Sequence, residues 1–366
     1  MTKPRLLWDV GTAYDLFTSL DVLHRPQHYR LRPAWAAGMR ARLPASARET
    51  LEQAQEMPVA FPVHWLHGLP EPKDAQAALQ SLRQIPAAER LPLLVLPEGI
   101  PPIFPPHWVP VLRDVAARAA WDEQDLEQMM GDAAQGKGAL AREKAVGHLE
   151  RWAQAADFGE RLLEALQLYV EVFFAEEEKR ILPALQAALA HARKLAQRLS
   201  LPALLEELSQ GLRLEELPPV SELVIVPSYW TTTRVYFGYV SPDRYLWMYG
   251  ARPPEESLVP GLPVPDTLLR RMQALSDPTR LRILSYLDEG ALAPAQLAKR
   301  LRLRLSTVLH HLDTLRVAGL VQLTIAEAKE KKLYAARPES IAATYRALQS
   351  FLSGSDEGEL DDPGEE

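Results

Sequence analysis

Apolar residues recur at three- and four-residue intervals along most of the first 200 positions of the chain. This spacing places apolar side chains on one face of a helix. It predicts helical stretches near residues 11–24, 33–55, 73–85, 111–130 and 139–200. Pro183 falls inside the last stretch and predicts a kink there, because proline removes a backbone hydrogen bond from a helix interior. The pattern predicts a mostly helical first half.

The pattern changes at Glu222, where shorter apolar runs typical of β-strands begin. Leu223–Val226 reads as a buried strand. Val235–Val240 and Tyr245–Tyr249 read as a hairpin, because Ser241-Pro-Asp-Arg244 between them carries proline and aspartate at suitable turn positions. We therefore expect a small sheet after the helices.

Aromatic residues concentrate in this sheet: residues 229–249 hold 8 of the 27 in the chain. Aromatic side chains are common in packed strands, which is one interpretation. The other is that one face of the sheet lines a pocket for an apolar or aromatic effector. The candidate pocket residues are Tyr229, Trp230, Tyr236, Tyr239, Tyr245 and Trp247.

A proline-rich linker at residues 251–265 separates two parts of different character. Residues 1–250 form the predicted N-terminal domain, and residues 266–353 form the C-terminal one. Residues 354–366 are acidic and almost free of apolar residues, so we expect a disordered tail. The expected fold class is mainly α with minor β.

The C-terminal domain shows the pattern of a helix-turn-helix followed by a β-hairpin, which is a winged helix. Expected helices begin at Asp266, at Pro278 with Asp277 as its cap, at Pro294, and at about Ser306, which can cap the recognition helix. Their inward-facing leucines and valines are Leu281, Leu284, Leu287, Leu297, Leu301, Leu305, Val308, Leu312 and Leu315. Two strands, Leu320–Ile325 and Lys332–Ala336, then flank a charged tip. A final helix over 338–352 has an apolar seam suited to pairing with a partner.

Charge separates the same parts. Residues 262–353 carry 14 basic and 8 acidic side chains, whereas residues 1–261 carry 27 basic and 33 acidic ones. The last 13 residues carry 7 acidic side chains and no basic one. A basic block inside an acidic protein indicates an anionic partner for that block alone.

The recognition helix, at about 306–318, suits the major groove of double-stranded DNA. If Val308 and Leu312 face inward, hydroxyl and imidazole groups point outward, where they can contact bases. Basic residues before the helix and on the wing, at about 321–336, would lie along the phosphates. The candidate DNA-binding residues are Arg302, Arg304, Ser306, Thr307, His310, His311, Thr314, Lys329, Lys331 and Lys332.

Two stretches resemble the arsenical-repressor (ArsR/SmtB) winged-helix family. Ala-Leu-Ser-Asp-Pro-Thr-Arg-Leu-Arg-Ile-Leu at 274–284 is similar to its opening helix, and Ser-Thr-Val-Leu-His-His-Leu at 306–312 to its recognition helix. The resemblance implies a dimeric bacterial repressor that releases DNA when an effector binds. It implies that Ser306, Thr307, His310 and His311 read DNA. Leu309 departs from the serine common in the family, and the cysteines of metal-sensing members are missing, so we expect no metal site.

The chain has no cysteine, no phosphate-binding glycine loop, no His-Glu-x-x-His and no nucleophile elbow. Two histidine pairs, His24 with His28 and His64 with His67, are weak metal candidates. We therefore predict no catalytic residues, no cofactor and no enzyme activity. The N-terminus carries no apolar signal segment and no stretch suits a membrane span, so we expect a cytoplasmic protein without a membrane partner.

Two hypotheses follow. In the first, the protein is a dimeric transcriptional repressor that reads an inverted-repeat operator, with its N-terminal domain sensing an effector or supporting the dimer. In the second, the N-terminal domain is an enzyme or a protein-binding scaffold, and the winged helix serves dimerisation.

Overall fold

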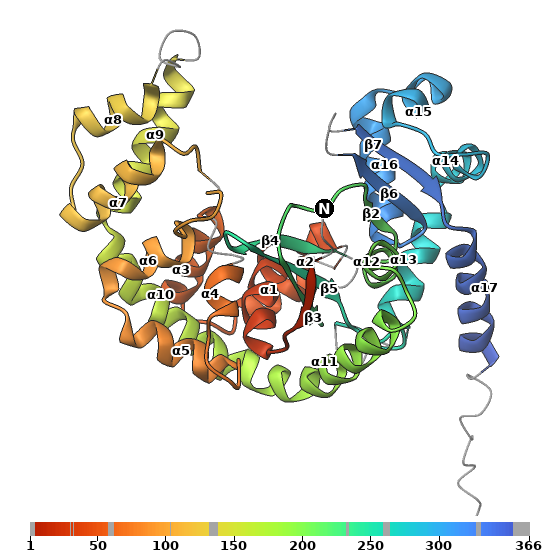
Figure 1. Ribbon diagram of the computed structural model, residues 1–366, viewed down its shortest axis with the longest axis horizontal. Coiled ribbons are helices and arrows are strands. Elements are labelled where there is room, and N and C mark those ends of the chain that lie inside the picture. Colours follow the sequence, from red (N-terminus) through yellow and green to blue (C-terminus); the bar gives the residue numbers. More distant parts are fainter. Residues whose placement is uncertain are drawn as a thin grey trace, which may run out of the picture. The chain divides into compact units, whose positions relative to one another are not determined.

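The computed structural model describes residues 4–29, 31, 33–57, 62–102, 104–131, 138–231, 234–258, 264–326 and 331–353. The chain divides into two compact units (Figure 1). The first consists of Met1–Leu189, Pro219–Trp230 and Tyr236–Met248. The second consists of Ala190–Pro218, Thr231–Val235 and Tyr249–Glu366. The expected linker at 251–265 therefore begins close to a unit border, but the second unit also takes in Ala190–Pro218 from the expected N-terminal domain.

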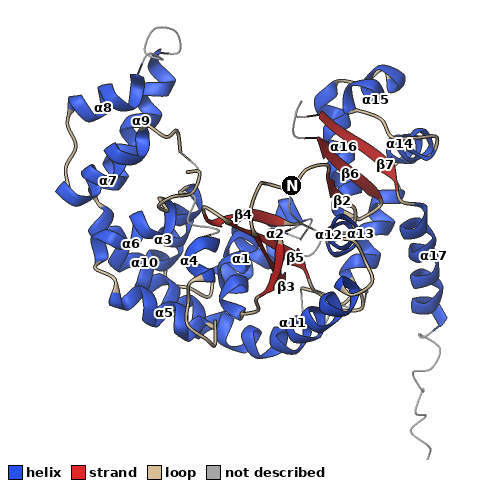
Figure 2. Ribbon diagram, viewed as in Figure 1, coloured by secondary structure: helices blue, strands red, loops and turns tan. Residues whose placement is uncertain are grey.

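The first unit is mostly helical, as the apolar spacing predicts (Figure 2). Its first helices are α1 (Thr12–His24), α2 (Pro33–Arg40), α3 (Ala45–Glu56), α4 (Val63–His67), α5 (Ala75–Gln84) and α6 (Ala87–Val95). They are followed by α7 (Trp108–Arg118), α8 (Glu123–Met130), α9 (Gly138–Ala153), α10 (Ala155–Tyr169), a π-helical turn (Val170–Phe174) and α11 (Ala175–Ala196). The expected long helical stretch is thus divided between α9 and α10 and again at the π turn, whereas Pro183 lies within α11.

The sheet of the first unit has four strands in the order β1-β3-β5-β4. They are β1 (Arg5–Trp8), β3 (Glu222–Ser228), β4 (Tyr236–Ser241) and β5 (Arg244–Gly250). The expected hairpin is confirmed, since Ser241 pairs with Arg244 across the Pro-Asp tip. Sequence patterning missed β1, because four residues are too few to show a period; the strand pairs in parallel with β3.

The second unit contains the expected winged helix. Its elements are α12 (Leu201–Leu208), β2 (Leu212–Leu214), α13 (Asp266–Leu275), α14 (Pro278–Asp288), α15 (Pro294–Leu301), α16 (Leu305–Val317), β6 (Val321–Ala326), β7 (Lys331–Ala336) and α17 (Pro338–Ser353). The Asp277 side chain caps α14 by accepting a hydrogen bond from the Arg280 N–H, at 2.9 Å. Gly319, at φ +68°, ends α16 in the left-handed conformation that the sequence suggested.

The core of the winged helix is formed by side chains from α13 to α16 and both wing strands. Its buried members are Ala274, Ile283, Leu284, Leu287, Leu297, Leu301, Val308, Leu312, Leu315, Ala318, Leu320, Val321 and Tyr334. Burial of these apolar side chains is the main free-energy gain that holds the four helices together.

Three expectations for this unit are wrong. Leu281 is 49% exposed and Leu305 is 48% exposed, so neither is a core residue. Leu281 lies beside the face of α14 that buries Ile283 and Leu284, and Leu305 is the first residue of α16. Ser306 does not cap α16, because the helix begins one residue earlier and Arg304 holds the N-cap position without a side-chain hydrogen bond.

The wing sheet has a third strand, which the sequence did not predict. Its order is β2-β6-β7, so β2 covers the edge of β6 that a two-stranded wing leaves open. In the parts of the chain that the structure covers, no helix combines the length and the apolar character that crossing a bilayer requires.

Candidate nucleic-acid interface

Helix α16 is fixed by its buried face, and this determines which residues it presents outward. Val308 and Leu312 are fully buried in the winged-helix core. Ser306, Thr307 and His310 are exposed on the other side of the same helix. Three of the predicted base-reading residues therefore lie together, with hydroxyl and imidazole groups accessible to a base edge.

Two predicted site residues of α16 are placed differently. The ring of His311 is half-buried, with its Nδ1 atom 4.0 Å from the Asp277 carboxylate at the start of α14. Burial lowers the pKa of His311 below its ordinary value, although the Asp277 charge acts in the opposite direction. The Thr314 hydroxyl donates to the backbone carbonyl of His310, at 2.9 Å. His311 thus packs within the winged helix, and Thr314 bonds its own helix.

The turn before α16 presents two arginines. Arg302 ends α15 in the left-handed conformation, at φ +57°, and its backbone N–H bonds to the carbonyl of Ala298. Arg304 follows two residues later as the N-cap of α16. Both side chains are exposed beside Ser306 and Thr307, where long cationic side chains can reach a phosphate.

The wing strands β6 and β7 pair in antiparallel register from Val321–Ala336 to Ala326–Lys331. Lys332 lies on β7 with an exposed side chain. Lys331 also lies on β7, where the structure describes its backbone. Lys329 falls outside the described residues. The predicted lysine cluster therefore has one member whose accessible position is established.

Three charged residues on or near α16 were missed by sequence reasoning. Asp313 is exposed on α16, and the guanidinium of Arg234 lies 3.9 Å from its carboxylate. Arg316 lies on the same helix and is buried apart from a small exposed fraction. Arg234 comes from the short segment Thr231–Val235, which belongs to the second unit. A residue 79 positions before its partner gives no local signal in the sequence.

The six residues of the candidate effector pocket fall into three groups. Tyr239, Tyr245 and Trp247 share one face of the β4–β5 hairpin, where Trp247 stacks on Phe237 with ring centroids 5.4 Å apart. Tyr236 faces the other side and bonds the Tyr29 hydroxyl. Tyr229 and Trp230 follow β3 and are fully buried, each bonded to a charged residue of α11: Tyr229 to Arg180 at 2.6 Å and Trp230 to Glu177 at 3.1 Å. All six residues lie on or directly after the neighbouring strands β3, β5 and β4, but their side chains do not share one face of the sheet.

Two of the histidines proposed as weak metal candidates, His64 and His67, bond to other residues of the fold. The Nε2 atom of His64 lies 2.8 Å from the carbonyl oxygen of Leu93. The Nδ1 atom of His67 lies 2.8 Å from the Asp9 carboxylate, which also accepts hydrogen bonds from Tyr14 at 2.8 Å and Lys73 at 2.5 Å. Burial raises the pKa of Asp9, but the bonds from His67 and Lys73 outweigh it and hold the pKa below its ordinary value. This cluster is a satisfied buried network.

A second buried carboxylate, Asp15, joins α1 to the end of β3. It accepts hydrogen bonds from the Ser228 hydroxyl at 2.6 Å and from the backbone N–H of Trp230 at 2.8 Å and of Tyr229 at 3.2 Å. Burial raises the pKa of Asp15 to about 7, against the lowering effect of these bonds. Sequence reasoning gave no indication of it, because nothing in the helical pattern of α1 marks one aspartate as buried.

Comparison with known proteins agrees with the position of the winged helix. A family model described as a helix-turn-helix domain matches residues 275–324. The HTH-type transcriptional regulator CmtR of Mycobacterium bovis is 51% identical over 57 residues, which is 16% of this chain and 48% of that protein. The same figures hold for CmtR from two strains of Mycobacterium tuberculosis. The chain thus carries a helix-turn-helix domain similar to that of a transcriptional regulator, and the match spans about half the length of these relatives.

Proposed function

We propose that this protein is a DNA-binding transcriptional regulator of the ArsR type. The observation that carries the proposal is the division of α16 into two faces. Its apolar side is buried in the helix-turn-helix core, whereas Ser306, Thr307 and His310 are exposed beside Arg302 and Arg304. An exposed polar helix flanked by cations matches the requirements for reading base edges while the phosphates fix the register.

The regulator acts as a homodimer. Apolar side chains on α13 and α17 remain exposed: Leu269, Met272, Tyr345 and Leu352. Tyr345 is 65% exposed and Leu352 is 61% exposed, and the two lie about two turns apart on the same face of α17. A second copy that pairs along these helices would bury them. Twofold symmetry then requires an inverted-repeat operator with half-sites about one DNA turn apart.

Repression is the mode of action that the resemblance to the ArsR/SmtB family favours, and it rests on that analogy. The first unit modulates DNA binding, by sensing a small effector or by supporting the dimer. An effector changes DNA affinity only if it binds one arrangement of the protein better than the other. The proposal places the protein in the cytoplasm, where the DNA is, and assigns it no enzymatic activity and no cofactor.

Selection of DNA from fragments of the source genome tests the proposal. The full-length protein should enrich one sequence class, with an inverted repeat at its centre. Fluorescence anisotropy should then show tighter binding to this site than to a scrambled duplex. If selection enriches no sequence, the regulator hypothesis fails. An assay of the full-length protein for small-molecule turnover or protein capture then tests the enzyme or scaffold alternative.

A further inference from the structure

The segment Ser209–Leu214, called the strap below, belongs structurally to the winged helix although it precedes it by some fifty residues. Its strand β2 pairs in parallel with β6, so that Leu212 lies opposite Leu323 and Leu214 opposite Ile325. The backbone N–H of Leu323 donates to the carbonyl of Gly211, at 2.8 Å. The strap therefore completes the wing sheet by covering its free edge.

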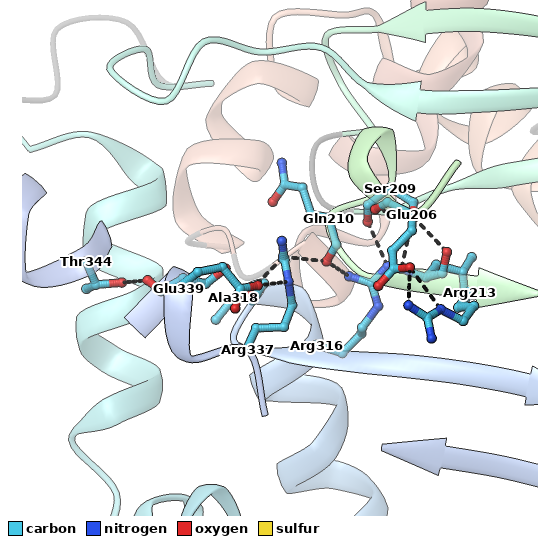
Figure 3. Close-up of polar contacts among 12 residues, drawn as sticks. Glu206, Ser209, Gln210, Arg213, Arg316, Ala318, Arg337, Glu339 and Thr344 are labelled. Carbon is cyan, nitrogen blue, oxygen red and sulfur yellow. Dashed lines mark hydrogen bonds and ion pairs between the residues drawn. The ribbon is translucent and has the colours of Figure 1, made fainter. Parts of the chain in front are cut away.

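Two arginines of the winged helix bind the turn of the strap (Figure 3). Arg316, in the last turn of α16, donates to the carbonyls of Ser209 at 2.9 Å and Gln210 at 3.3 Å. Arg337, directly after β7, donates to the same Gln210 carbonyl at 2.8 Å and to the carbonyl of Gly319 at 3.2 Å. The Gln210 carbonyl of the strap thus accepts hydrogen bonds both from the end of the recognition helix, through Arg316, and from the end of the wing, through Arg337.

The turn has little freedom to adopt another shape. Gln210 and Gly211 have φ angles of +54° and +99°, which are left-handed conformations. A Cβ atom on Gly211 would lie 2.8 Å from Cδ of Arg337 and 3.4 Å from the Cα of Gln322 on β6. The Arg316 side chain is partly buried, and this burial lowers its pKa to about 10. The strap and the two arginines form one packed joint.

We propose that the strap is a positioning element of the winged helix. Docked on β6, Arg316 and Arg337, it holds the recognition helix and the wing in the arrangement that reads the operator. This inference rests on the proposed function. Because α11 and α12 directly precede the strap, and the border of the two units falls within α11, any shift of α12 relative to the wing must strain or release this joint. Release of the strap would lower operator preference without removing the cations that bind phosphate.

The substitution Gly211→Ala in the full-length protein tests the inference, because it adds one methyl group against Arg337. The matched control is Gly290→Ala. Gly290 also lies in the second unit and has a positive φ, +155°, but an added Cβ meets nothing within 4 Å. Two readouts are measured: amide hydrogen exchange at Leu323, whose partner is the Gly211 carbonyl, and the ratio of scrambled-site to operator Kd.

We expect Gly211→Ala to speed exchange at Leu323 and to lower the operator preference about tenfold, equivalent to about 1.4 kcal/mol, with binding to scrambled DNA nearly unchanged. Gly290→Ala should leave both readouts at the wild-type value. A protein that was merely destabilised would lose operator and scrambled binding in equal proportion. If Gly211→Ala changes neither Leu323 exchange nor the preference, the inference is overturned.

Arg316→Lys provides a second route should Gly211→Ala fail to fold. Lysine keeps the positive charge but loses the planar fork that reaches two carbonyls, so we expect a smaller loss of preference and faster exchange at Leu323. Arg282→Lys, on the exposed face of α14, is its control. If wild-type protein shows no operator preference, the proposed function fails. The exchange rates alone then decide whether the strap positions the wing.

Discussion

The guanidinium of Arg316 donates a hydrogen bond of 2.9 Å to the carbonyl oxygen of Ser209, a residue 107 positions earlier in the chain. This bond ties the end of the recognition helix to a segment outside the helix-turn-helix match at 275–324. The folded winged helix is therefore larger than its sequence motif, and a fragment that begins at the linker would lack the third strand of its wing sheet.

Residues of α16 and of the wing should affect DNA binding in different ways. Ser306→Ala removes a hydroxyl that we propose contacts a base edge, so it should weaken operator binding by about 1–3 kcal/mol and leave scrambled DNA nearly unaffected. Lys332→Ala removes a cation from the wing, so it should weaken both and reduce the salt slope by about one. Anisotropy titrations at several salt concentrations measure both effects. Equal losses on the two DNAs from both variants would contradict the assignment of roles.

The dimer interface proposed on α17 predicts a change of oligomeric state. Tyr345→Glu places a charge in the exposed apolar seam, and the cost of burying it should shift the protein toward monomer and weaken operator binding. Ser350→Glu adds the same charge to an exposed position away from the seam and should leave the dimer intact. Sedimentation velocity distinguishes the two. A dimer that persists in Tyr345→Glu would mean that the copies pair elsewhere.

Asp15 predicts a dependence of stability on pH. Its pKa is about 7 in the folded protein and near the ordinary 3.8 in the unfolded chain. The folded state holds the proton more tightly than the unfolded chain does. The contribution of Asp15 to the free energy of unfolding is therefore full below pH 4 and is lost as pH rises toward 7. Within that window the free energy of unfolding should fall by on the order of 1.4 kcal/mol per pH unit.

Urea unfolding at pH 5, 6, 7 and 8 measures this loss. Asp15→Asn cannot release a proton and should flatten the profile, whereas Asp157→Asn, exposed on α10 beside Arg161, should keep the wild-type shape. A wild-type profile as flat as that of Asp15→Asn would show that the buried carboxyl does not titrate in this range.

Burial of leucines in the winged helix predicts a contrast in stability. Leu312 is fully buried in the core, so Leu312→Ala should lower the free energy of unfolding by about 2–5 kcal/mol. Leu281 is 49% exposed, so Leu281→Ala should cost less than about 1 kcal/mol. Denaturant unfolding of the two variants checks the difference. Similar losses would mean that Leu281 is buried after all, for example by a second copy.

The sequence predicted the winged helix almost element by element, because each of its signals is local. Asp277 followed by proline marks the start of α14, Gly319 marks the end of α16, and the leucine spacing separates buried from exposed faces. The errors at Leu281 and Leu305 arose at the margins of helical faces, where spacing alone does not distinguish the edge of the core from the surface. The four-residue strand β1 was too short for any period.

The joint between the strap and the winged helix could not be predicted, because the residues that meet in it are distant in sequence. Arg316 and Arg337 read as two more cations of a basic block, and only the fold shows that they bind backbone carbonyls of Ser209 and Gln210. The same holds for His311, which the family motif places on the DNA side but which packs beside Asp277. Local patterns predict elements, whereas long-range contacts decide what a charged or polar residue does.

The central claim is that α16 reads a specific DNA sequence. Fluorescence anisotropy of the full-length protein against its own upstream DNA, and against a scrambled duplex of equal length, tests it most directly when repeated over a range of salt concentrations. The account predicts tight binding that prefers the upstream site, with affinity falling steeply as salt rises. Weak binding that is equal for both duplexes at every salt concentration, together with no enriched site from genomic selection, would contradict it.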